Sequence, residues 1–234
     1  NNAKRPLICA GGGVILGDGE KVIRGFCEKF NIPLVHTMMG IGVLPKKHPL
    51  YFGMLGNNGK PYANKAVERA DLLIVVGARI ADRAVQKPEH LARRVPIIHI
   101  DIDTAEIGKN LGPTIPLVGD LKEIFRILTD EDITPSDRSW IEELEEIKRN
   151  TVDTRIFSTR FVNPITLVQR LTEKMDDNAV YVADVGQNQL WSADNYVMKD
   201  GNFMTTGGMG TMGYSIPAAM GAKLFAPERQ TVAV

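Results

Sequence analysis

The feature that most constrains the fold of this sequence is an alternation of short apolar runs with longer amphipathic stretches. Runs of strand length that are apolar almost throughout lie at residues 6–10, 32–37, 72–77, 96–103 and 115–119. Such runs are typical of parallel strands that are covered on both faces. Residues 20–30 and 62–70 place apolar side chains at helical spacing. The pattern predicts βαβ units, and therefore an α/β fold with a doubly wound parallel sheet in the first half.

The character of the sequence changes twice beyond this sheet. Residues 129–154 are charged and helical, with Pro135-Ser136-Asp137 as a cap and a narrow apolar stripe that starts at Trp140. A second α/β pattern begins at Asn163-Pro164, a helix cap followed by a first-turn proline. It continues with predicted helices at 165–174, 187–196 and 215–225 and predicted strands at 179–185, 203–206 and 230–234. We therefore predict a central domain over residues 1–130, a helical linker over 131–160 and part of a second α/β domain over 161–234.

Charge and cysteine content exclude several classes of function. The 28 Lys and Arg residues equal the 28 Asp and Glu residues, so no net charge attracts a nucleic acid or an anionic membrane. No apolar run approaches the roughly 18 residues of a membrane span. Cys9 and Cys27 have no partner pattern, and the four histidines show no metal-ligand spacing. We expect a cytoplasmic protein without nucleic-acid partner, membrane segment or metal ligands of its own.

Several clusters in the first half follow predicted strands at their carboxyl ends, where open α/β sheets bind ligands. Gly11-Gly12-Gly13 fails the dinucleotide fingerprint, because the third glycine should fall at Leu16. The other clusters are Thr37-Met38-Met39-Gly40, Gly77-Ala78-Arg79 with Asp82-Arg83, and Asp101-Ile102-Asp103. An Arg suits a pyrophosphate and an Asp suits ribose hydroxyls, so an adenine dinucleotide is the natural candidate. For each cluster alone, a plain turn or a structural ion pair is the alternative.

A second glycine cluster, Gly208-Met209-Gly210-Thr211-Met212-Gly213, matches G-x-G-x-x-G between a predicted strand and a predicted helix. About twenty residues later the chain has no Asp or Glu that could bind a ribose, so the match does not indicate a dinucleotide site. Gly210 could instead let its backbone carbonyl reach a ligand, and Met212 could be an adaptable apolar support. The alternative is that Met212 packs in the core between helix and strand.

Motifs in both halves together resemble the acetolactate synthases, a family of thiamine-diphosphate enzymes. In the second half, Asp184-Val185-Gly186-Gln187-Asn188-Gln189-Leu190-Trp191 and residues 207–219 are similar to that family's cofactor domain. In the first half, residues 53–56, 71–74, 77–79, 82–83 and 99–110 are similar to its central domain, in the same order. The resemblance implies a homodimeric or homotetrameric transferase of branched-chain amino acid biosynthesis. Such an enzyme decarboxylates pyruvate and transfers the two-carbon unit to a second 2-oxo acid.

The resemblance also assigns ligands to residues of this sequence. Thiamine diphosphate would contact Val185, Gly186, Gln187 and Asn188 with its diphosphate, and Gly210, Thr211 and Met212 with its pyrimidine ring. FAD or ADP would be held by Gly11, Gly12, Gly13, Thr37, Met38, Met39, Gly77, Arg79, Asp82, Arg83, Asp101, Ile102 and Asp120.

The family's Mg²⁺ motif would follow Val234, and its catalytic glutamate belongs to a preceding domain. The chain has no initiator Met and stops in an apolar run that reads as a buried strand. We therefore expect a fragment that contains no catalytic residue and is inactive alone.

Three departures from the family leave alternatives open. Asn188 stands where acetolactate synthases usually have His, Asn57-Asn58 replaces a Met-His pair, and Ala81 replaces an Asp. Another 2-oxo acid decarboxylase or carboligase of the same architecture is one alternative, with ADP or nothing in place of FAD. A non-catalytic adenine-nucleotide-binding module is the alternative outside the enzymes.

Overall fold

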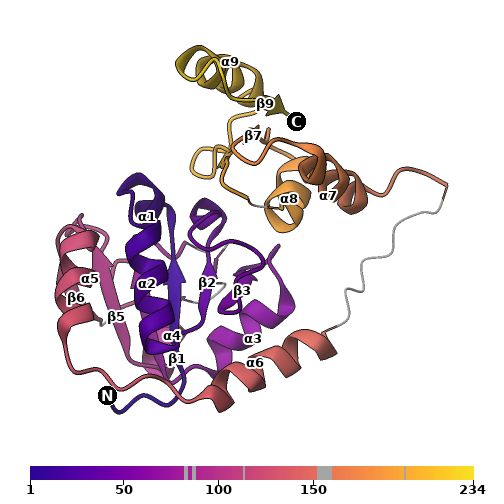
Figure 1. Ribbon diagram of the computed structural model, residues 1–234. Coiled ribbons are helices and arrows are strands. Elements are labelled where there is room, and N and C mark those ends of the chain that lie inside the picture. The colour runs from indigo at the N-terminus through magenta and orange to yellow at the C-terminus, as the bar shows by residue number, and fades with distance from the viewer. Residues whose placement is uncertain (82–83, 86–87, 113, 152–159, 198) are drawn as a thin grey trace. The chain divides into compact units, whose positions relative to one another are not determined.

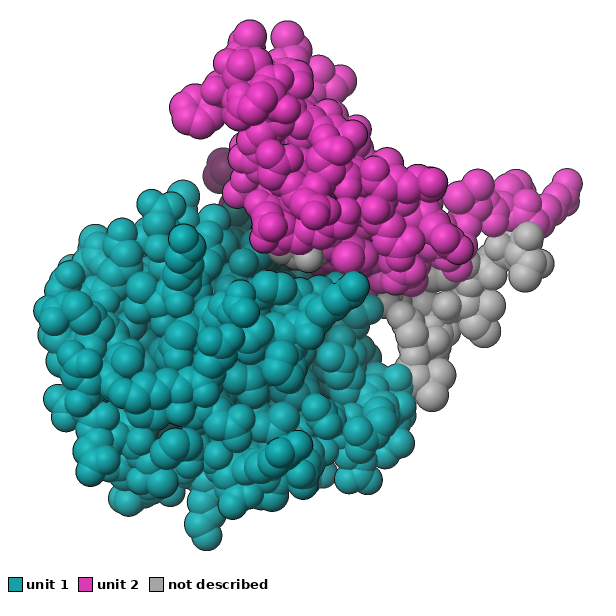
Figure 2. All heavy atoms as spheres, in the orientation of Figure 1, with its two compact units in different colours: residues 1–152 teal, residues 153–234 magenta. Residues whose placement is uncertain are grey.

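The computed structural model describes residues 1–81, 84–85, 88–112, 114–151, 160–197 and 199–234. The chain divides into two compact units, Asn1–Val152 and Asp153–Val234 (Figure 2). No helix in the described ranges is both long enough and apolar enough to cross a bilayer.

A six-stranded sheet, in which all pairs of neighbours are parallel, is the frame of unit 1. Its strands are β1 (Pro6–Ala10), β2 (Leu34–His36), β3 (Tyr51–Met54), β4 (Leu72–Val76), β5 (Ile97–Asp101) and β6 (Ile115–Val118). Their order in the sheet is β3-β2-β1-β4-β5-β6, so the direction of strand addition reverses between β1 and β4. The predicted doubly wound parallel sheet is confirmed, and this reversal is where such sheets bind ligands.

Helices surround this sheet (Figure 1). They are α1 (Gly12–Leu16), α2 (Glu20–Phe30), the short 3₁₀ helix η1 (Met38–Gly40), α3 (Pro61–Arg69), α4 (Pro88–Arg94), α5 (Leu121–Asp130) and α6 (Arg138–Asn150). The apolar face of α2 is buried, and its Phe26 ring meets Phe125 of α5 edge-on at 4.9 Å between ring centres. Asp120 begins α5 by accepting a hydrogen bond from the Lys122 amide at 2.7 Å.

The helix predicted within the linker is α6, and it packs into the core of unit 1. Asp137 caps it by accepting from the Ser139 amide at 2.7 Å. Trp140 is only 1% exposed, and its indole N–H donates to the Pro6 carbonyl at 2.9 Å. Trp140 therefore links α6 to the first strand of the sheet.

Unit 2 has a smaller parallel sheet in the order β8-β7-β9. Its elements are α7 (Pro164–Lys174), β7 (Val180–Val182), α8 (Gln187–Asn195), β8 (Asn202–Met204), α9 (Ser215–Phe225) and β9 (Thr231–Ala233). Asn163 caps α7 as predicted, because its side chain accepts from the amides of Ile165 and Thr166. The rings of Tyr181, Tyr196 and Phe203 pack together in the interior.

Burial differs from expectation at two strands. The apolar run 115–119 was expected to be covered on both faces, but β6 is an edge strand, and Ile115 and Val118 are 56% and 50% exposed. The last strand, β9, was expected to be buried and is also partly exposed, because it forms an edge of its three-stranded sheet. An edge strand has a neighbour on one side only. The sequence alone does not reveal which strands lie at the edges of a sheet.

Truncating Trp140 tests the anchoring of α6. Trp140→Ala removes a buried indole and leaves the Pro6 carbonyl without its donor, and we expect unit 1 to lose about 3–5 kcal/mol of unfolding free energy. Trp140→Phe keeps most of the packing, and its cost should be about 1–3 kcal/mol. Urea unfolding followed by circular dichroism measures both. A Trp140→Ala change below about 1 kcal/mol would show that α6 is not part of this core.

Candidate functional site

The carboxyl edge of the unit 1 sheet gathers the residues predicted to bind a nucleotide. Since the strands are parallel, the segments that follow them start at one edge. Gly11, Gly12 and Gly13 follow β1, Thr37, Met38 and Met39 follow β2, Gly77 and Arg79 follow β4, Asp101 and Ile102 lie at the end of β5, and Asp120 follows β6. Asp82 and Arg83 lie outside the described residues.

The glycines at the β1 and β4 ends are explained by backbone packing. The Gly13 N–H donates to the Gly77 carbonyl, and the Gly11 N–H donates to the Val76 carbonyl, each at 2.9 Å. A Cβ on Gly11 would lie 2.2 Å from the Gly77 carbonyl oxygen, and one on Gly13 would lie 2.7 Å from the Gly77 Cα. The two turns approach too closely for any side chain, and these two amides are already engaged within the protein.

Around this contact lie groups that suit an adenine nucleotide. Leu16 is 89% exposed and Ile102 is 73% exposed, so apolar surface is available for a flat ring system. Arg79 is exposed, and its carbonyl is fixed by the Asn110 side chain at 2.7 Å. The carboxylate of Asp101 accepts from the Asp103 amide at 3.0 Å. Among its described residues, this edge therefore offers the Arg79 guanidinium, carboxylates and exposed apolar side chains.

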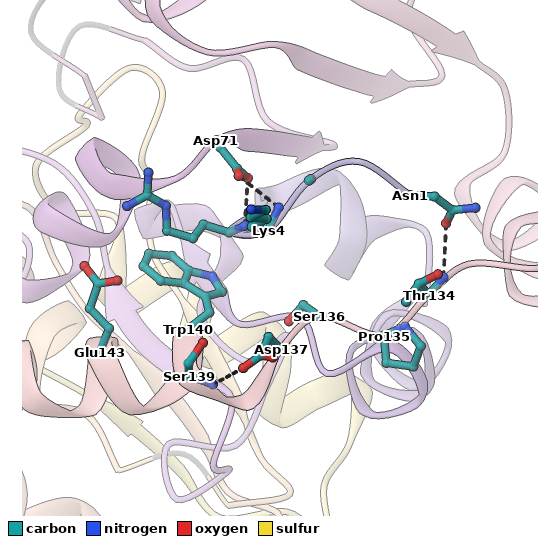
Figure 3. A pocket seen from close by; sticks show the side chains of 12 residues that line it. Asn1, Lys4, Asp71, Thr134, Pro135, Ser136, Asp137, Ser139, Trp140 and Glu143 are labelled. Atoms are coloured by element: carbon teal, nitrogen blue, oxygen red, sulfur yellow. Dashed lines mark hydrogen bonds between the residues drawn. The ribbon is translucent and has the colours of Figure 1, made fainter.

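The opposite edge of the same sheet has a groove of about 620 Å³, between the chain start and α6 (Figure 3). Its Asp71 carboxylate accepts the backbone N–H groups of Lys4 and Arg5 at 2.9 and 2.8 Å. Asp137 is likewise engaged as the cap of α6. Both carboxylates are therefore occupied by backbone N–H groups of the protein itself. We conclude that the groove has a structural role and is not the candidate site.

In unit 2, Asp184 is the centre of the corresponding carboxyl edge. One of its oxygens, Oδ1, accepts from the amides of Val185 at 2.8 Å and Gly213 at 2.9 Å, and Oδ2 accepts from the Ser215 amide at 2.8 Å. The N–H groups of Ser215 and then Gly213 stabilise the charged form and lower the pKa of Asp184 to about 2. The sequence gives no role to this residue, because its partners lie 29 and 31 residues away.

The glycine loop, residues 207–213, forms an exposed turn. Gly210 and Gly213 have φ of 62° and 84°, a left-handed conformation that favours glycine. Between them Met212 is 79% exposed, so the alternative that it packs in the core of unit 2 is wrong. Among the described residues, neither the Met212 N–H nor the Gly210 carbonyl makes a hydrogen bond. The turn thus presents one donor, one acceptor and an apolar side chain.

Asn188 has its side chain engaged within the protein. Its Nδ2 donates to the carbonyls of Val234 at 2.8 Å and Asp184 at 3.3 Å, and its Oδ1 accepts from the Ser192 hydroxyl at 3.2 Å. The amide therefore joins α8 to the ends of β7 and β9. A ligand at this residue would meet its backbone N–H, which lies in the first turn of α8 and has no partner within the helix.

Buried Gln189 is a further residue whose role the sequence motifs do not predict. Its Nε2 donates to the Thr205 hydroxyl at 2.7 Å and to the Thr206 carbonyl at 3.2 Å, just before the glycine loop.

The described residues contain no group of three or more His, Cys, Asp or Glu side chains that could hold a metal ion.

The unusual pKa of Asp184 predicts an acid sensitivity of unit 2. Because the folded-state pKa of about 2 lies below the ordinary 3.8, the stabilisation is complete above 3.8 and is lost as the pH falls through about 2. Asp184→Asn should lower stability at neutral pH and flatten the pH dependence in this range. Urea unfolding of unit 2 at several pH values measures both effects. An unchanged slope in the variant, compared with Asp200→Asn as a control, would contradict the assignment.

Comparisons with known proteins match both units. Residues 1–128 match the thiamine pyrophosphate enzyme central domain, and residues 184–234 match the thiamine pyrophosphate enzyme C-terminal TPP binding domain. A probable acetolactate synthase large subunit of Methanocaldococcus jannaschii is 38% identical over 99% of this chain and 41% of its own length. The acetolactate synthase large subunit of Lactococcus lactis is 38% identical, over 98% of this chain and 40% of its length. The isozyme 1 large subunit of Escherichia coli is 37% identical, over 99% and 41%.

The chain therefore spans about two fifths of the length of these relatives. The family resemblance predicted from the motifs is confirmed in both halves. The chain belongs to the thiamine pyrophosphate enzyme family.

Proposed function

We propose that this chain acts in a thiamine-diphosphate-dependent carboligase of the acetolactate synthase type. The reaction would be the decarboxylation of pyruvate and the transfer of its two-carbon unit to a second 2-oxo acid, in branched-chain amino acid biosynthesis. Family membership and the names of the relatives support this proposal. The observation that carries it is the turn at Met212, with its free donor, free acceptor and exposed side chain.

The residues of unit 2 fit thiamine diphosphate. When bound, this cofactor supplies the carbon nucleophile that attacks a 2-oxo acid. The Gly210 carbonyl would accept from the pyrimidine amino group, the Met212 N–H would donate to a ring nitrogen, and Thr211 and the Met212 side chain would lie against the ring. Val185, Gly186, Gln187 and Asn188 would bind the diphosphate through backbone N–H groups at the start of α8. We assign no Mg²⁺ ligand to the described residues.

For unit 1 we propose an adenine nucleotide, FAD or ADP, at the carboxyl edge of the sheet. Support comes from the reversal of strand order between β1 and β4 and from Arg79, Leu16 and Ile102 around it. Gly11 and Gly13 would shape the turn without donating their amides, while Gly12, Met39 and Asp101 would border the nucleotide.

We also propose a homodimer or homotetramer in the cytoplasm. On α9, Ile216, Met220 and Leu224 recur every fourth residue and are 66%, 62% and 82% exposed, and such an apolar stripe suits burial against another protein surface. Cys9 and Cys27 are buried free thiols, which suits a reducing compartment.

Replacing Met212 tests the cofactor site. In the longer protein that also carries the Mg²⁺ motif and the preceding domain expected for this family, titration calorimetry with thiamine diphosphate and Mg²⁺ should show binding. Met212→Ala should weaken it about tenfold or more, because the apolar contact that the Met212 side chain would make with the ring is lost. Met209→Ala is the matched control, because Met209 is 91% exposed in the same loop, and its affinity should stay unchanged. No binding by that unchanged longer protein, or equal affinities in the two variants, would contradict the site.

Nucleotide titrations test unit 1 and separate the alternatives. FAD binding with a change in flavin fluorescence favours an enzyme of the acetolactate synthase type. ADP binding without FAD binding favours another decarboxylase or carboligase, or a non-catalytic module. In either case Arg79→Ala should weaken binding about tenfold or more, and Arg138→Ala on α6 should leave it unchanged. If neither nucleotide binds, the assignment of this edge is wrong.

A further inference from the structure

Asp184 joins two segments that are far apart in the sequence. It lies two residues after the end of β7, and its carboxylate accepts from the Gly213 and Ser215 amides at 2.9 and 2.8 Å. These amides belong to the end of the glycine loop and the first residue of α9. The carboxylate therefore fixes where the glycine loop ends relative to the start of α8.

The start of the glycine loop is held separately. Buried Gln189 of α8 binds the Thr205 hydroxyl and the Thr206 carbonyl at 2.7 and 3.2 Å, and the Thr205 hydroxyl in turn donates to the Ala183 carbonyl at 3.0 Å. Between these anchors the loop is open, because a Cβ on Gly208 or Gly210 would meet nothing within 4 Å. The position of the Met212 turn thus depends on its two ends.

The hydrogen bonds of Asp184 also determine which backbone N–H groups of the glycine loop remain available to a ligand. Asp184 engages the N–H groups of Gly213 and Ser215, whereas the Met212 N–H has no acceptor among the described residues. A carboxylate suits this position because two oxygens can accept from three N–H groups at once. The three donors also offset a negative charge that would otherwise repel a nearby diphosphate.

We infer that Asp184 is a positioning residue for thiamine diphosphate: by holding Gly213 and Ser215, it sets the spacing between α8, where the diphosphate would bind, and the Met212 N–H and Gly210 carbonyl, where the pyrimidine ring would bind. This inference rests on the proposed function. Asp184 itself need not touch the cofactor, because it acts through the backbone of the glycine loop.

The test compares Asp184→Asn, Asp184→Ser and Asp184→Glu in the longer protein that carries this chain together with the Mg²⁺ motif. Asn turns an NH₂ group toward N–H donors, Ser removes the carboxylate without adding that donor, and Glu keeps both acceptor oxygens. Hydrogen exchange without cofactor measures the Gly213 and Ser215 amides, and calorimetry measures the affinity for thiamine diphosphate with Mg²⁺. Asp200→Asn is the control, because it makes the same change at an exposed residue before β8, at the other edge of the sheet.

We expect exchange at the two amides to become about tenfold faster or more in the Asn and Ser variants, and by a larger factor than at the Tyr181 amide in the core, whose exchange follows the global stability of unit 2. Their affinity should fall about tenfold or more, Glu should restore part of both losses, and Asp200→Asn should change neither. The Ser variant decides if the Asn variant does not fold.

Faster exchange with unchanged affinity would overturn the inference, and so would unchanged exchange. If the unchanged longer protein does not bind thiamine diphosphate at all, the proposed function fails instead, whatever the exchange data show.

Discussion

All strand pairs in both sheets are parallel, so the segment after each strand must start at the same edge of its sheet. The candidate sites depend on this constraint. In unit 1 it brings together turns that are more than a hundred residues apart, from Gly11 to Asp120. In unit 2 it places the loop after β7, the glycine loop after β8 and Val234 after β9 around Asp184. Residues that follow different strands therefore lie along one edge of a sheet, although nothing else in the sequence links them.

Sequence periodicity is enough to predict elements whose burial follows from their own residues. The predicted ranges 6–10, 20–30 and 215–225 coincide with β1, α2 and α9. The strand β3 is not predicted, because Gly53 interrupts a short run whose burial comes from neighbouring elements. The exposure of β6 and the burial of Trp140 on α6 depend on which surfaces meet in three dimensions, and periodicity does not specify that.

The same distinction applies to the candidate site. Val185, Gly186, Gln187, Gly210 and Met212 can be selected by their motifs, because each motif is local. The hydrogen bond between Asp184 and the Gly213 amide spans 29 residues, and the one between Gln189 and the Thr205 hydroxyl spans 16. Such contacts cannot be read from a local motif, so they are seen only in the structure. Asn188 shows the reverse case: its motif predicts a contact with the diphosphate, and the structure binds its side chain to the Val234 and Asp184 carbonyls. Its replacement of a histidine is thus consistent with a backbone contact to the diphosphate.

We propose that the Met212 turn receives the aminopyrimidine ring of the cofactor. The most direct measurement follows the Met212 backbone amide by NMR, in ¹⁵N-labelled protein that carries this chain together with the Mg²⁺ motif, while thiamine diphosphate and Mg²⁺ are added. If the amide donates to the ring, its resonance shifts to lower field as the cofactor saturates and its hydrogen exchange becomes slower. A resonance that stays in place while the cofactor saturates the chain, or the absence of any saturation, would contradict the claim.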